Sequence, residues 1–197
     1  QNGIYGRAAG MKRAEKREHL IDTAIDLFNR AGFHAVGIDQ VIAESGIAKT
    51  TLYRHFRSKD DLIVAVLQRI DAAFRDALRQ TVEAAAPDPV ARILASFDFL
   101  ETWFRDKAFY GCPFMGAAGE YGERTSPVFQ AALVHKRLMI DYFEDLARAA
   151  AHPDPRRFAE EINLLHEGAI AVAHIAGEPA AARTARGIAE RLIRDNL

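Results

Sequence analysis

The sequence has only one cysteine, Cys112, and no long apolar run in its 197 residues. A single cysteine cannot close a disulfide within the chain, and such sparse use is typical of a reducing cytoplasm. Because no stretch of about 18 apolar residues occurs, we expect no membrane-spanning helix and no membrane partner. No charged segment followed by an apolar one opens the chain, so we also expect no secretory leader.

Patterns for enzyme chemistry are absent as well. The sequence has no Gly-rich phosphate loop, no metal-binding motif and no nucleophile paired with a base at a recognisable spacing. Cys112 lacks such a base nearby, and a small buried thiol is the alternative that we favour. His166 and His174 could suggest metal, but their spacing places them about 80° apart around a helix, and the alternative is buried, hydrogen-bonded histidine. We therefore expect no enzyme, no metal and no cofactor.

The chain as a whole has no excess of positive charge, but its N-terminal part has one. The formal net charge is −1, yet residues 1–60 hold 10 Lys and Arg against 7 Asp and Glu. The remainder holds 16 against 20, so the two parts carry +3 and −4. This asymmetry predicts that an anionic partner such as DNA binds the N-terminal part. It also argues against a protein that binds nucleic acid nonspecifically over its whole surface.

Two amphipathic helical segments meet at a glycine in VIAESGIAKTTLYRHF, residues 41–56. Apolar residues recur at helical spacing on both sides of Gly46, and Leu52 and Phe56 mark the inner face of the second segment. Glycine tolerates the positive φ of a tight turn, so very few residues are needed between the helices. This arrangement is typical of a helix-turn-helix, whose second helix enters the DNA major groove.

The outer face of the second segment carries side chains suited to DNA. Hydroxyl groups donate to phosphate oxygens, lysine supplies charge, and Arg54 and His55 can reach base edges. On this segment alone, an ordinary solvated helix with a basic rim is the alternative interpretation. The outer-face residues are Lys49, Thr50, Thr51, Tyr53, Arg54 and His55.

The flanking segments favour the DNA-binding interpretation. Residues 17–33 place an apolar stripe on one helical face and end at Gly32, so a third helix can close a small core. Ser58 followed by Asp61 resembles a capping box and predicts a helix that begins near Lys59. The exposed amides of that helix start, with Lys59 beside them, form a second phosphate clamp.

Residues 32–62 resemble the N-terminal DNA-binding domain of the TetR family of one-component bacterial regulators, and the similarity extends back to residue 17. The shared features are the Gly-aromatic helix end, the TLYRHF recognition helix and the F-x-S-K-x-x-L entry to the next helix. The resemblance implies an all-helical homodimer in which a ligand in the C-terminal domain shifts the N-terminal domains and releases operator DNA. It also implies DNA contacts at Lys49, Thr50, Thr51, Tyr53, Arg54, His55 and Lys59.

Two features depart from the family pattern. The family often has Ser or Thr where this chain has Val36 and Gly37, and Ser where it has Ala48, so side-chain caps are missing at the starts of two helices. Loss of such a cap typically costs ~1 kcal/mol. We therefore expect packing, more than capping, to hold the recognition helix.

Helix-start signals divide the rest of the chain, and no segment alternates with period two. A capping residue precedes proline three times, and Glu178-Pro179 adds a fourth signal. The predicted fold class is all-α, with about nine helices. Residues 1–10 are interpreted as a disordered arm or expression remnant, 11–60 as the helix-turn-helix domain and 61–197 as the effector-binding and dimerisation domain. The later helices are expected at 59–82, 89–106, 112–119, 127–151, 155–176 and 179–195.

Aromatic residues gather in the C-terminal half. Each is ordinarily a core residue, but bulky side chains that converge from several helices also form apolar ligand pockets. Residues 111–121 resemble a turn of TetR-family regulatory domains, and we place the pocket between it, 89–106 and 155–176. Tyr110, Arg137, His166 and His174 are the polar candidates for orienting an effector. The predicted pocket residues are Phe74, Phe97, Leu100, Trp103, Phe104, Tyr110, Phe114, Met115, Phe129, Leu133, Arg137 and His166.

Small and branched side chains dominate the last two helices. They allow close helix approach, either as an internal seam or, as the resemblance implies, in a four-helix dimer interface. Operator geometry also favours a dimer, because two recognition helices must face major grooves ~34 Å apart. The predicted interface residues are Leu165, Ala169, Val172, Ala173, Ala176, Ala181, Ala185, Ile188 and Leu192.

These features lead to one hypothesis, a TetR-like repressor released from a palindromic operator by a small hydrophobic molecule. The expected partners are double-stranded operator DNA, a second copy of the chain and that effector. The alternatives are a TetR-like activator and, in a different class, a helical small-molecule carrier without DNA binding. A carrier shares the aromatic pocket but has no use for residues 41–56.

Overall fold

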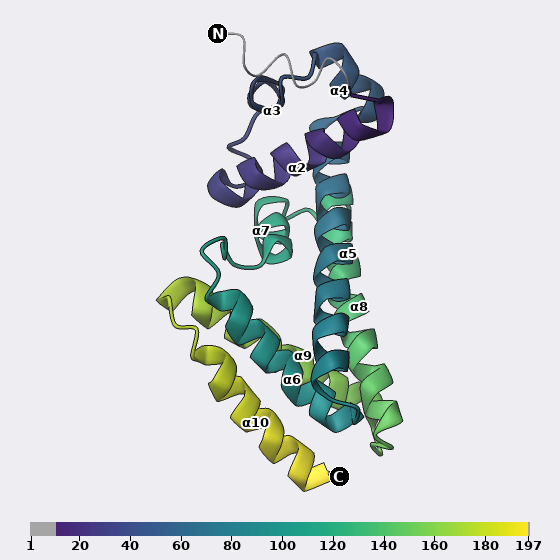
Figure 1. Ribbon diagram of the computed structural model, residues 1–197, viewed down its shortest axis with the longest axis vertical. Coiled ribbons are helices and arrows are strands. Elements are labelled where there is room, and N and C mark those ends of the chain that lie inside the picture. The colour runs from purple at the N-terminus through teal and green to yellow at the C-terminus, as the bar shows by residue number, and fades with distance from the viewer. Residues whose placement is uncertain (1–10, 197) are drawn as a thin grey trace. The chain divides into compact units, whose positions relative to one another are not determined.

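The computed structural model describes residues 11–196, and in this range the chain forms nine helices and no strand (Figure 1). This confirms the predicted all-α class. The predicted arm at 1–10 lies outside the described residues. The helices are α2 (Arg13–Ala31), α3 (Ile38–Ser45), α4 (Lys49–His55), α5 (Lys59–Ala85), α6 (Pro89–Phe104), α7 (Pro113–Glu120), α8 (Pro127–Ala149), α9 (Pro155–Ala176) and α10 (Ala181–Asn196).

N-cap side chains accept a first-turn amide at four of the nine described helix starts, those of α5, α6, α8 and α9. Asp88 accepts the N–H of Ala91 at 2.8 Å, and Asp154 accepts the N–H of Arg157 at 3.2 Å. Each follows the rule that a capping oxygen satisfies an amide that has no partner within the helix. The expected start at Pro179 is wrong, because α9 ends at a left-handed glycine and a turn precedes α10.

The chain divides into two compact units. The first comprises the chain up to Ile70 together with Pro113–Leu133, and the second comprises Asp71–Cys112 together with the chain from Val134 onward. Helices α5 and α8 therefore each contribute residues to both units. The functional boundary expected at residue 60 stays a prediction. None of the helices between residues 11 and 196 combines the length and the apolar character needed to cross a membrane.

The core of the first unit holds the helix-turn-helix. Leu20 of α2, Leu52 of α4 and Leu62 of α5 are each completely buried. Gly46 adopts the left-handed conformation, with φ of 65°, and its N–H donates to the carbonyl of Ile42. The tight turn between α3 and α4 that the sequence predicted is thus formed.

Glu120, at the end of α7, fixes the turn that follows α2. Its carboxylate accepts the backbone N–H of Phe33 at 2.9 Å and that of His34 at 2.5 Å. The His34 ring also packs against Tyr121, with 4.6 Å between ring centroids. Burial, and then the acceptor Asp60, raises the pKa of Tyr121 to about 12. A segment remote in sequence thereby becomes part of the first unit.

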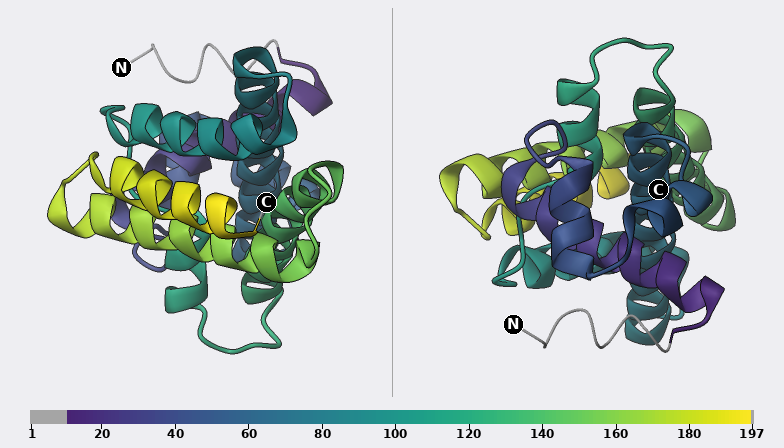
Figure 2. Two further views of the ribbon diagram at one scale, coloured as in Figure 1. Left: turned by 90° about the horizontal axis from the view of Figure 1, so that it is seen from below. Right: turned by 90° about the horizontal axis from the view of Figure 1, so that it is seen from above.

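In the second unit, α10 packs against both α6 and α9 (Figure 2). The core contains the largest fully buried side chains among the described residues, Phe97, Phe143 and Phe158. Apolar residues spaced along one face of each helix build this core, as the sequence pattern predicts.

His166 lies inside this core. The Ser96 hydroxyl donates to the Ile93 carbonyl at 2.5 Å, so the Nε2–H of His166 donates to Ser96 Oγ at 2.8 Å. The rings of Phe97 and Phe143 flank the imidazole at centroid distances of 4.4 and 4.8 Å. Burial lowers the pKa of His166 to about 3, so the imidazole is neutral at pH 7.

The buried imidazole predicts a loss of stability in acid. Between its ordinary pKa of 6.5 and about 3, the unfolded chain binds a proton that the folded chain excludes. The free energy of unfolding therefore falls as the pH falls through this window, by at most about 1.4 kcal/mol per pH unit. We expect urea midpoints to drop less steeply between about pH 7 and pH 5 in His166→Leu than in wild type. An identical slope in both proteins would assign the effect to other groups.

Candidate nucleic-acid interface

Burial of one face positions α4. Leu52 is fully buried and Phe56 nearly so, whereas the N-cap residue Ala48 makes no side-chain hydrogen bond. The prediction that packing holds this helix is therefore confirmed. On the opposite face, Tyr53 is 45% exposed and Arg54 is also exposed.

The seven predicted DNA-contact residues all lie on α4 or at the start of α5. Two of their cations have partners within the protein. Lys49 Nζ lies 2.9 Å from Asp39 Oδ1, and this hydrogen bond raises the pKa of Lys49. Lys59 Nζ donates to the carbonyl of His34 at 3.1 Å. Thr50 is exposed, and Thr51 and His55 are half-buried.

The start of α5 has a modified capping box. Ser58 Oγ accepts the N–H of Asp61 at 3.1 Å, as the sequence predicted. The Asp61 carboxylate accepts the N–H of Arg57 at 3.0 Å. In a standard capping box it would accept the N–H of the N-cap residue itself, Ser58. The N–H of Asp61, one of the amides of the predicted phosphate clamp, thus already has a hydrogen-bond partner within the protein.

Sequence reasoning missed two cations beside α4. Arg13 and Lys16, in the first turns of α2, line a hollow of about 460 Å³ with Thr51, Arg54 and His55. Burial, followed by repulsion from Arg13 and Arg17, lowers the pKa of His55. The available signal was the basic run KRAEKR, residues 12–17.

The residues predicted to form an effector pocket are divided between the units. Phe114, Met115, Phe129 and Leu133 belong to the first unit and the other eight to the second. The predicted pocket therefore stays a prediction.

An aromatic cluster in the second unit brings some of the predicted pocket residues together. Phe74 lies 5.2 Å from Trp103, Trp103 lies 5.8 Å from Phe104, and Phe109 lies 4.9 Å from Trp103, between ring centroids. Tyr110 and Arg137 are exposed, while Phe97, Leu100 and His166 are buried in the unit's core. The ring of His174, the remaining polar candidate for orienting an effector, lies 6.2 Å from that of Phe109 between centroids.

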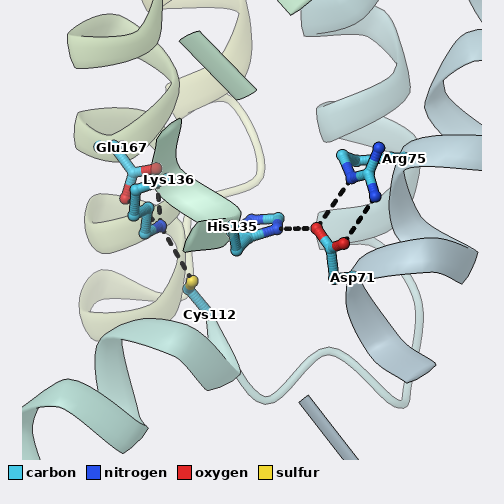
Figure 3. A network of polar contacts seen from close by, with 6 residues as sticks. All are labelled: Asp71, Arg75, Cys112, His135, Lys136 and Glu167. Atoms are coloured by element: carbon cyan, nitrogen blue, oxygen red, sulfur yellow. Dashed lines mark hydrogen bonds and ion pairs between the residues drawn. The ribbon is translucent and has the colours of Figure 1, made fainter. Parts of the chain in front are cut away.

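A polar network borders the aromatic cluster, and its residues were not predicted as a group (Figure 3). Asp71 accepts two hydrogen bonds from Arg75, at 2.8 and 2.7 Å. His135 Nδ1 lies 2.8 Å from Asp71, and the His135 ring lies 6.0 Å from that of Phe74. Burial lowers the pKa of His135 to about 4, so the neutral ring donates its Nδ1–H to Asp71. These contacts place hydrogen-bonding groups next to Phe74.

The second part of the network includes the cysteine. Lys136 Nζ donates to the Glu167 carboxylate at 2.6 and 2.7 Å and to Cys112 Sγ at 3.3 Å (Figure 3). Cys112 is partly exposed, and this corrects the expectation of a buried thiol. The loop before α7 leaves the thiol at the surface beside the Lys136 ammonium group.

The predicted interface residues fall into buried and exposed groups. Ala169, Ala173 and Ala185 are buried within the subunit. Val172 and Ala176 are exposed, and the other predicted members, Leu165, Ala181, Ile188 and Leu192, are half-buried. Two residues outside the predicted set are more exposed than Val172, which is 46% exposed: Leu164 is 72% and Ile175 84% exposed. With Val172 they form an apolar face on α9, because their spacing follows the helical repeat.

Two family models match the sequence. One, described as bacterial regulatory proteins of the tetR family, matches residues 20–66. The other, described as the tetracyclin repressor-like C-terminal domain, matches residues 89–189.

Comparison with individual proteins also gives transcriptional regulators of this kind. The crystal structure of a TetR-family transcriptional regulator from Streptomyces coelicolor is 32% identical, with a TM-score of 0.81 over 92% of this chain and 96% of that one. The HTH-type transcriptional activator FasR from Mycolicibacterium smegmatis is 37% identical over 48% of this chain and 45% of FasR. The HTH-type transcriptional repressor NemR from Escherichia coli is 31% identical over 42% of each chain. The chain thus spans less than half the length of these two curated relatives.

Proposed function

The chain belongs to the TetR family of bacterial regulatory proteins, and from this premise we propose that it is a transcriptional repressor that binds operator DNA as a homodimer. The observation that carries the proposal is α4. Its inner face is anchored by Leu52, while its outer face presents Thr50, Tyr53 and Arg54 to solvent. A helix held in this way can enter a major groove without rearrangement.

The outer face of α4 divides into two kinds of contact. Arg54 carries a planar guanidinium group that can bind a guanine edge through two hydrogen bonds. The hydroxyls of Thr50 and Tyr53 donate to backbone phosphates and fix the register of the helix. Arg54 therefore reads sequence, and the hydroxyls position the protein.

A second copy of the chain is the partner that fits the exposed face of α9. Leu164, Val172 and Ile175 expose an apolar stripe that water solvates poorly. In a twofold dimer the same stripe from each subunit meets its counterpart. The dimer then presents two α4 helices to successive major grooves, about 34 Å apart.

A small hydrophobic effector is proposed to bind beside Phe74 and Trp103. Their rings, with the hydrogen-bonding pair of Asp71 and His135 at the edge, combine apolar contact with a polar group that orients a ligand. The effector releases DNA only if it binds the DNA-incompetent arrangement more tightly. A difference of about 3 kcal/mol weakens operator binding roughly 150-fold.

Activation of transcription is the second candidate. The observation that favours it is the similarity to FasR, whose name describes an activator. Deleting the gene separates the two functions, because transcription from the bound promoter rises if the protein represses and falls if it activates.

Substitutions on α4 test the proposed DNA face. Arg54→Ala should weaken operator binding by about 1–3 kcal/mol, or roughly 5- to 150-fold, for each of the two subunits, and reduce the preference over a scrambled duplex. Tyr53→Phe should weaken both duplexes alike. Fluorescence anisotropy measures both, with Arg79→Ala, an exposed arginine of the second unit, as the control. Wild-type affinity in both α4 variants would remove α4 as the DNA face.

The single tryptophan reports on the effector site. A screen of small hydrophobic compounds by thermal shift should find one that stabilises the free protein and dissociates the DNA complex. Its binding should change the emission of Trp103 over the same concentration range that releases DNA. Release of DNA without any change in Trp103 emission would place the effector elsewhere.

Charged substitutions on α9 test the dimer. Leu164→Glu combined with Ile175→Glu should yield monomers in sedimentation velocity and weaken operator binding strongly, because a carboxylate would be buried in an apolar contact. Gln80→Glu introduces a carboxylate at an exposed position of α5 and should leave the dimer intact. A dimer that survives the double substitution would place the interface on another surface.

A further inference from the structure

The start of α2 and the outer side of α4 together enclose a concentrated positive surface. The two helices contact each other within the first unit (Figure 1). The hollow between them is lined by Arg13 and Lys16 from α2 and by Thr51, Arg54 and His55 from α4. Three of these groups carry permanent positive charge, one is a histidine, and one is a hydroxyl. Among the described residues, none that lines this hollow carries a carboxylate.

Acidic groups near the start of α2 are engaged elsewhere. The Glu15 carboxylate accepts the backbone N–H of Lys12 at 2.7 Å. Glu18 pairs with Arg17 at 3.0 Å and also with Arg69. Within residues 11–196, no ion pair neutralises the three cations of the hollow. Their fields therefore add in the space between the helices.

We propose that this hollow holds a phosphate group of the DNA backbone, and that His55 is protonated when the phosphate binds. Arg13 and Lys16 thereby join the DNA surface, although they lie outside the helix-turn-helix. The inference rests on the proposed DNA-binding function and adds a defined phosphate site to it.

The residue types match a phosphate. Arginine and lysine form short, charge-assisted hydrogen bonds to phosphate oxygens, and the Thr51 hydroxyl supplies a neutral donor. The volume of about 460 Å³ leaves room for a phosphate together with water. Arg54 lies at the border of the site, so the same contact that holds the backbone also orients the side chain that we assign to base reading.

His55 couples the site to pH. From α2 it faces Arg13, Lys16 and Arg17, and on α4 it neighbours Thr51 and Arg54, with the Phe56 ring at 6.2 Å. Burial and the two arginines lower its pKa, so the free protein disfavours the imidazolium. A phosphate in the hollow offsets that repulsion and raises the pKa in the complex. Binding then takes up a proton, so affinity rises as the pH falls.

Neutral substitutions at the start of α2 test the site. Arg13→Gln and Lys16→Gln should each weaken binding to operator and scrambled duplex alike, and each should make the salt dependence shallower by ~0.9 per subunit, or ~1.8 for the dimer. Arg30→Gln, an exposed cation at the other end of α2, is the control and should match wild type. Anisotropy titrations at several salt concentrations measure all four proteins.

The outcomes separate the two proposals. If wild type and Arg30→Gln bind operator while Arg13→Gln and Lys16→Gln keep wild-type affinity and salt slope, the phosphate site is overturned and the proposed function stands. If wild type binds no duplex from its own promoter, both fail.

Inorganic phosphate is titrated in parallel, with the His55 ring protons followed by NMR. A response to inorganic phosphate but not to duplex would overturn the assignment to DNA.

The proton coupling has its own test. At constant ionic strength, wild-type affinity should rise severalfold from about pH 8 to about pH 6, with a limit of about tenfold per pH unit for the His55 of each subunit. His55→Gln should flatten this dependence, whereas His34→Gln, which removes an exposed imidazole outside the hollow, should retain it. A wild-type pH slope in His55→Gln would overturn the coupling.

Discussion

Burial of Leu52 and Phe56 is the interaction on which the proposed DNA surface depends. Helix α4 has seven residues and no side-chain cap, and so short a helix is not stable alone in water. Truncating a buried leucine typically costs ~2–5 kcal/mol, whereas a missing N-cap costs ~1 kcal/mol. Packing therefore dominates, and the rigid inner face determines where Tyr53 and Arg54 point.

Glu120 supplies the second constraint on the first unit. Its carboxylate binds two backbone amides of the turn after α2, and each hydrogen bond to a charged group contributes roughly 1.5–3 kcal/mol. Gly32 allows this approach, because a Cβ there would lie 3.1 Å from Glu120 Oε1 and its φ is 85°. The helix-turn-helix is thus completed by α7, which lies far from it in sequence.

Local signals predicted the helices better than they predicted the contacts. Asp154 before Pro155 defines the start of α9, and Gly46 defines a turn, because each residue acts on the backbone next to it in sequence.

The sequence also predicted the functional class. Membership of a family of transcription regulators confirms that the chain is not an enzyme. The contact of Glu120 with Phe33 has no local signature. Small residues such as Ala169 were ambiguous, because they suit a seam within a subunit as well as an interface between subunits.

The pairing of cations decides how strongly each can attract DNA. Lys49 and Arg17 contact Asp39 and Glu18, so a phosphate has to compete with a carboxylate for them. The cations of the hollow have no such competitor within the described residues, and a phosphate gains their full attraction. Counting charges along the sequence treats all of them as equal. The fold instead concentrates the attraction beside Arg54, so binding to the backbone and reading of bases depend on the same few side chains.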